Sequence, residues 1–105
     1  MKFLIKGSYQ ASGVKGLLSE GGTSRREAIR ELTESLGASL EAFYFAFGDT
    51  DVYAIVDAPD VATITALALH INATGAVSVT TVPLITAEEV DEATKKKAGY
   101  RAPGV

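Results

Sequence analysis

The chain has 105 residues, of which 47% are hydrophobic and 22% charged, so it is one globular domain rather than a disordered segment. Ten basic against thirteen acidic residues give a net charge of −3, which disfavours a general nucleic-acid binder. The absence of cysteine excludes disulfides, thiolate zinc sites and cysteine nucleophiles.

The charges are distributed unevenly along the chain. Residues 1–94 carry six basic and thirteen acidic groups, whereas residues 95–105 carry four basic and no acidic ones. We therefore expect a domain over 1–94 and a basic, frayed C-terminal tail over 95–105. Because the first residues lack the apolar run of a signal peptide and no apolar stretch could span a bilayer, we expect a cytoplasmic protein without a membrane partner.

The first third of the chain predicts a strand and two helices. Alternating apolar and polar residues indicate a strand over 2–9, which is followed by a short helix over 11–20. A longer helix comes next, with Ser24 or Thr23 as its N-cap and Gly37 as its left-handed stop. Its apolar stripe is expected to face the core, opposite a charged face formed by Arg25, Arg26, Arg30, Glu31 and Glu34.

The rest of the chain alternates strand and helix patterns in the same way. The predicted elements are strands over 40–47 and 52–57, a helix over 59–73, a strand over 76–84 and a terminal helix with a capping box at Thr86 and Glu89. The order β-α-β-β-α-β with an appended helix predicts an α+β fold. It is typical of a ferredoxin-like plait with a four-stranded antiparallel sheet.

Both faces of this predicted sheet are apolar. If Phe47 lies opposite Val52, the phenylalanines share the helix-covered face. The uncovered face then carries Leu40, Ala42, Tyr44, Ala46, Tyr53 and Ile55. An apolar patch of that size is unusual on a monomer, so we expect a homodimer in which two sheets pack face to face. The alternative is a monomer whose terminal helix, from Thr86 onward, covers this face.

Polar side chains on the uncovered face predict a ligand site between the paired sheets. Lys6 and Ser8 share one face of the first strand, and a lysine beneath the helices would be costly unless paired. Together with Tyr44 and Tyr53 they are expected to line a cleft for a small, partly apolar or acidic molecule. In the alternative interpretation these groups satisfy one another and trapped waters.

Three blocks of sequence resemble the GYD domain family, over about residues 1–90. The blocks are Gly21 to Ala28, Glu41 to Gly48, and Asp51-Val52 with Val56 to Asp60. The resemblance implies a dimeric α+β barrel of ferredoxin-like subunits. Such barrels include cofactor-free monooxygenases, dye-type peroxidases and small-molecule sensors, so the fold names no activity. The family's characteristic tyrosine is replaced here, since the segment reads Gly48-Asp49-Thr50-Asp51.

A second candidate site lies at the start of the second helix. Free backbone N–H groups at Gly22 and Thr23, with Arg26 nearby, are suited to a phosphate or carboxylate. The segment contains neither a P-loop nor a dinucleotide-binding motif. Capping between the two helices is the simpler explanation of these residues.

Catalytic candidates are sparse. His70 is the only histidine, and either His70 or Tyr53 is the candidate acid–base group. One histidine and unclustered carboxylates predict no metal site, and we expect no cofactor. Three functions remain open: a dimeric small-molecule-binding or accessory domain, a cofactor-free monooxygenase- or isomerase-like enzyme, and a structural partner of another protein.

Overall fold

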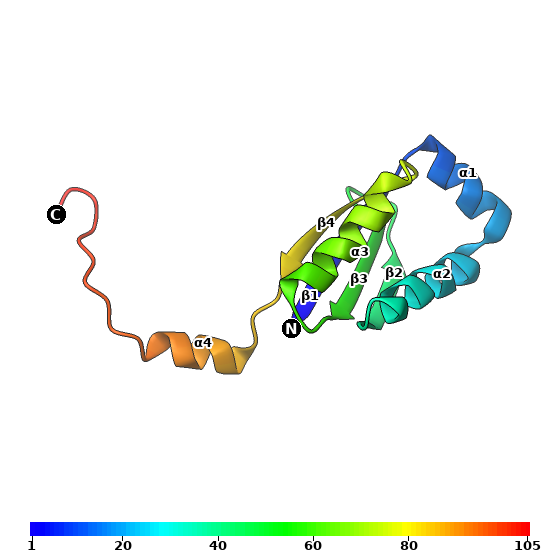
Figure 1. Cartoon of the computed structure of the whole chain (residues 1–105). Helices are drawn as coiled ribbons and strands as arrows, with labels where there is room; N and C mark the ends of the chain where they lie inside the picture. The colour runs from blue at the N-terminus through cyan, green and yellow to red at the C-terminus, as the bar shows by residue number, and fades with distance from the viewer.

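The computed structural model describes residues 1–105 as four helices and a four-stranded antiparallel open sheet (Figure 1). The strands are β1 (Lys2–Tyr9), β2 (Ser39–Phe45), β3 (Val52–Asp57) and β4 (Val77–Pro83). The helices are α1 (Ala11–Glu20), α2 (Gly22–Ser35), α3 (Val61–Ala73) and α4 (Ala87–Thr94). The strand order is β2-β3-β1-β4, so β1 and β3 are the central strands. The α+β class is therefore confirmed.

One face of the sheet is covered by α2 and α3, and the core lies beneath them (Figure 1). Ile64 and Leu67 of α3 pack against Phe3 and Ile5 of β1 and against Val56 of β3, which is fully buried. Burial of each such side chain contributes about 1.5–3 kcal/mol. This is the face that the alternation in 2–9 assigns to the core.

The capping box confirms the predicted start of α4, whereas α3 begins at Val61 with Asp60 as its N-cap, two residues after the predicted start at 59. The carboxylate of Asp60 accepts hydrogen bonds from the backbone N–H and the hydroxyl of Thr63, at 2.8 and 2.7 Å. These bonds hold the pKa of Asp60 below its ordinary value, led by the bond from the hydroxyl. At α4, Thr86 and Glu89 form both hydrogen bonds of a capping box.

The predicted N-cap of α2 is wrong, because the helix begins earlier than either Thr23 or Ser24. Its first residue is Gly22 and its N-cap is Gly21, which has a φ of +84° and makes no side-chain cap bond. The N–H of Gly21 also bonds to the carbonyl of Leu17 and ends α1. One glycine therefore ends one helix and begins the next, which leaves no position for a separate cap.

The β2–β3 hairpin differs from the prediction in two places. Phe45, not Phe47, pairs with Val52. Phe47 has left the strand, with a φ of +55° and a side chain that is 61% exposed. A bulge between Leu40 and Ala42 then reverses the side on which Leu40 lies.

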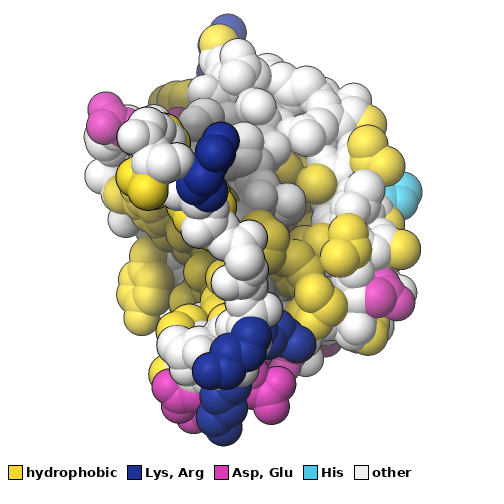
Figure 2. Space-filling model, turned by 90° about the vertical axis from the view of Figure 1, so that its left-hand side faces the viewer, with side chains coloured by type: hydrophobic (Ala, Val, Ile, Leu, Met, Phe, Trp, Pro, Cys, Tyr) yellow, Lys and Arg dark blue, Asp and Glu magenta, His cyan; other side chains and the backbone are white.

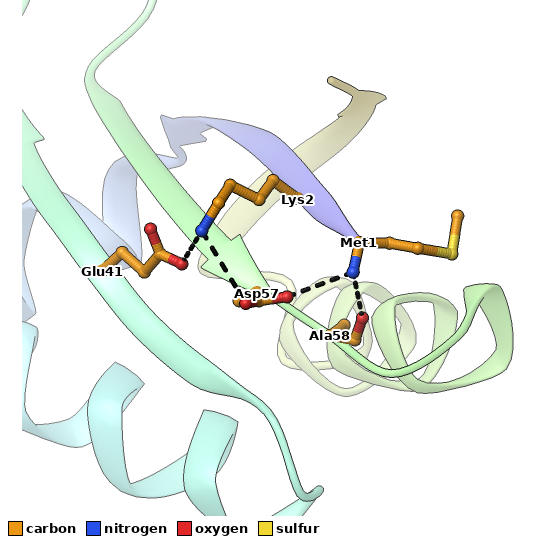
Figure 3. A network of polar contacts seen from close by, with 5 residues as sticks. All are labelled: Met1, Lys2, Glu41, Asp57 and Ala58. Atoms are coloured by element: carbon orange, nitrogen blue, oxygen red, sulfur yellow. Dashed lines mark hydrogen bonds and ion pairs between the residues drawn. The ribbon is translucent and has the colours of Figure 1, made fainter. Parts of the chain in front are cut away.

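Leu40 pairs with Val56 and is buried in the helix-covered core, so its assignment to the uncovered face is wrong. The extra residue of the bulge is Glu41, whose side chain pairs with Lys2 of β1 (Figure 3). That contact joins strands far apart in the sequence, so no local pattern signals it.

At the same end of the sheet, the start of the chain is hydrogen-bonded to the end of β3 (Figure 3). The Met1 amino group donates to the Asp57 carboxylate at 3.1 Å and to the Ala58 carbonyl at 3.0 Å. The hydrogen bond from this amine is the main cause that lowers the pKa of Asp57. Since these groups are exposed, they fix the strand ends in register more than they add stability.

Helix α4 and residues 95–105 extend away from the body (Figure 1), and every residue from 81 to 105 is exposed. The terminal helix therefore does not cover the open sheet face of its own chain. The radius of gyration is 17.3 Å, against about 13 Å for a compact chain of similar length. Figure 2 shows basic side chains of the extended segment in front of a broad set of hydrophobic side chains. None of the helices has the length and hydropathy needed to cross a membrane.

Candidate functional site

The residues predicted to line a cleft lie together on the uncovered face of the sheet. Tyr44 pairs with Tyr53, Tyr53 pairs with Lys6, and Lys6 pairs with Thr80, so these four form one row across all four strands. Ser8 lies on the same face beyond this row. Tyr44 is 71% and Tyr53 37% exposed. No hollow of the single chain lies over Lys6, Ser8 or Tyr53.

The next row on this face is apolar. It consists of Ala42, Ile55, Leu4 and Val82 in register across the sheet. An aromatic and aliphatic face of this kind is typical of a surface that is covered in the assembled protein.

A larger hollow lies on the other face, between the sheet and helices α1, α2 and α3. It has a volume of about 390 Å³. An apolar chamber of about 40 Å³ lies next to it, against the sheet. The residues that line both spaces are Tyr9, Arg25, Ile29, Ile71 and Val77. We call these five residues the neck, since they mark the boundary between the chamber and the outer hollow.

The chamber is open on the side of the sheet because β1 carries a glycine there, which has no side chain to fill the space. Gly7 is buried, and a Cβ at this position would lie 3.5 Å from Val77 and 3.6 Å from Val52 and Val79. These are ordinary van der Waals distances. A methyl group therefore fits at Gly7 and would occupy part of the chamber.

The neck combines an aromatic and a cationic side chain. The Tyr9 ring is stacked near Phe45, with 6.4 Å between centroids and 18° between planes. Burial raises the pKa of Tyr9, and the nearby Arg25 guanidinium opposes part of that rise. The Arg25 side chain is 29% exposed, and its Nη1 lies 3.5 Å from Oε2 of Glu20.

Tyr9 is held in place by the β2–β3 turn. The Tyr9 backbone N–H donates to the Asp51 carboxylate at 2.8 Å, and the Asp51 N–H donates to the Gly7 carbonyl at 2.9 Å. These bonds connect the hairpin to the end of β1 that reaches the neck. They also give Asp51, one of the residues that resemble the GYD pattern, a positioning role.

Helix α1 closes one side of the outer hollow through a very close approach. A Cβ on Gly13 would lie 2.2 Å from the carbonyl oxygen of Ala76 and 2.8 Å from Tyr9 Cδ1. The Gln10 N–H donates to that same Ala76 carbonyl at 2.8 Å. Only glycine permits this packing of α1 against the start of β4.

The two acid–base candidates do not lie together. His70 is exposed on α3 at the rim of the outer hollow, whereas Tyr53 lies on the opposite face of the sheet. The structure holds no group of three or more His, Cys, Asp or Glu side chains that could bind a metal ion.

The three residues of the predicted anion site do lie together. Gly22, Thr23 and Arg26 line a shallow hollow of about 290 Å³ with three aromatic residues of β2. The Arg26 guanidinium already pairs with Glu27, at 3.1 Å from Nε to Oε1. Anion binding at this site stays a prediction.

Arg25 is the site residue that the sequence analysis placed on the wrong side. It was expected on the charged, solvent-facing side of α2, but it lies at the neck with Ile29. The spacing of Arg25 and Ile29 indicates this position, because residues four apart share one face of a helix. The alternation in 2–9 places Tyr9 on the face of Phe3 and Ile5, but no local pattern predicts the space around it.

Comparisons with known proteins identify a family but no individual relative. No curated protein matches the chain significantly. At the turn where the GYD pattern has tyrosine, Thr50 is buried and lines none of the hollows. The model of the GYD domain family matches residues 3–94. The chain therefore belongs to the GYD domain family.

Proposed function

We propose that this chain is a subunit of a homodimer that binds a small, partly apolar molecule between the sheet and helices α1, α2 and α3. The observation that carries the proposal is the apolar chamber that meets a larger, more polar hollow at the neck. Ligand sites in proteins commonly combine an apolar lining with a few polar groups that fix orientation. Here Tyr9 and Arg25 are those polar groups.

The homodimer is supported by the open sheet face. The strand order β2-β3-β1-β4 with α2 and α3 on one side is the order of a ferredoxin-like plait. Its other face carries the tyrosine row and the apolar row described above. Two such faces packed across a two-fold axis would form a dimeric α+β barrel and remove both rows from water.

A ligand between the two sheets, on Lys6, Ser8, Tyr44 and Tyr53, remains the second position to consider. These side chains share one face, and Lys6, Tyr53 and Tyr44 are in register across it. The helix side is favoured because a hollow with an apolar end already exists there in one chain.

Fragment screening by ¹H–¹⁵N NMR tests the proposal. We expect binding fragments to shift the backbone resonances of Gly7, Tyr9, Arg25, Ile71 and Val77. Gly7→Ala should weaken the binding of these fragments about fourfold, since its methyl group occupies part of the chamber, where lost apolar contact is worth about 0.8 kcal/mol per methylene. Gly48→Ala is the matched control, because nothing lies within 4 Å of its added Cβ.

Two results would contradict this proposal. In the first, no fragment at millimolar concentration shifts the neck residues. In the second, the shifts gather at Lys6 and Tyr53 and are unaffected by Gly7→Ala, which would place the ligand between the sheets.

A further inference from the structure

We infer that the ligand is a small carboxylic acid with an apolar body, whose carboxylate is bound by Arg25 at the neck. This inference rests on the proposed function, because it concerns the same hollow. It adds the chemical class of the ligand and the residue that selects it.

The position of Arg25 is the first observation. Its side chain is 29% exposed and lines both the chamber and the outer hollow. The chamber is otherwise lined almost entirely by hydrophobic residues. A guanidinium has five N–H donors in a planar fork and remains charged at neutral pH. At this position the fork lies at the boundary between the chamber and the outer hollow.

The second observation is that Arg25 is only weakly paired with a carboxylate. Glu20 is the one carboxylate within 4 Å of it, through a single 3.5 Å contact from a side chain that is 48% exposed. Arginine binds a carboxylate best through two parallel hydrogen bonds, which this pair does not form. A ligand carboxylate could therefore replace Glu20 on the guanidinium, while Glu20 turns into water at the end of α1.

The residues that line the outer hollow indicate the size and polarity of the rest of the ligand. Ala28, Ile29, Leu32, Ile71 and Val77 give the hollow an apolar part. A volume of about 390 Å³ is near the lower end of the roughly 300–1,000 Å³ typical of small-molecule sites. The charged or titratable groups that line the hollow are Arg25, Glu20, Tyr9 and His70. Such a site fits one ring or a short chain with a single carboxylate.

Benzoate and benzamide provide the test, because they match in shape and differ in charge. By isothermal titration calorimetry at pH 7.5, we expect benzoate to bind at least tenfold more tightly than benzamide, as charge-assisted hydrogen bonds are the stronger kind. Arg25→Met should remove this preference. Lys15→Met, which deletes a positive charge from an exposed position of α1 outside the hollow, should preserve it.

A variant of Glu20 is expected to change the affinity for benzoate in the opposite direction. Since Glu20 competes for Arg25 and repels an anion, Glu20→Gln should tighten benzoate binding about threefold and leave benzamide unchanged. Glu31→Gln, an exposed change on α2 outside the hollow, should alter neither ligand.

The two proposals fail in different ways. Equal affinities for benzoate and benzamide, unaffected by Arg25→Met, would overturn the acid preference and leave binding in the hollow intact. If neither compound binds while neutral fragments from the NMR screen do, the carboxylic acid inference is also wrong. If no fragment reaches the neck, the proposed function fails first.

Discussion

Gly13→Ala is expected to destabilise the protein by about 3 kcal/mol. Its Cβ would lie 2.2 Å from the carbonyl oxygen of Ala76, which is backbone and cannot rotate away. Helix α1 must therefore shift, and the hydrogen bond from the Gln10 N–H to the same carbonyl is strained or lost. Urea unfolding at one fixed protein concentration measures the effect.

Gly16→Ala is the control for this change, on the same helix. Nothing lies within 4 Å of its added Cβ, so it should stabilise α1 by up to about 1 kcal/mol through helix propensity. The two glycine-to-alanine substitutions, three residues apart, are thus expected to change the stability of the protein in opposite directions. Equal stability of the two variants would show that α1 is not packed against Ala76 as described.

If the protein forms the proposed homodimer, Ile55→Asp is expected to leave it a folded monomer. Ile55 lies in the apolar row, paired with Leu4 and Ala42 on the open face. In a face-to-face dimer the two-fold axis brings two new carboxylates into one interface, and each unpaired buried charge costs several kcal/mol. We expect the dissociation constant to rise at least 100-fold, measured by sedimentation equilibrium against the 11.0 kDa mass of one chain.

Val61→Asp is the matched control, since Val61 is exposed in the first turn of α3, where an acidic side chain is tolerated. It should remain dimeric. A wild-type protein that sediments as one chain at micromolar concentration would contradict the dimer, as would an Ile55→Asp variant that dimerises with unchanged affinity.

Much of the fold follows from local patterns. The period-two alternation of β1 places Phe3, Ile5 and Tyr9 on the core side, and the cap at Asp60 fixes the start of α3. Beyond the bulge, the side chains of β2 and β3 also lie on the predicted faces of the sheet, because Tyr44 and Tyr53 share the open face. In each case the deciding interaction is between residues close in the sequence.

The errors arise where distant residues decide the structure. The bulge that turns Leu40 into the core accompanies an ion pair between Glu41 and Lys2, from strands that are far apart in the sequence. The outer hollow likewise depends on how α1 packs against Ala76, and the chamber depends on the space that Gly7 leaves open. A sequence pattern can place Tyr9 on a face, but it cannot show that Arg25 lines the same hollow.

A crystal structure of the protein soaked with benzoate tests whether the ligand lies on the helix side of the sheet. We expect electron density in the hollow, with the carboxylate on the Arg25 guanidinium and the ring toward Ile29 and Val77. Density confined to the space between the two sheets, near Lys6 and Tyr53, would contradict it.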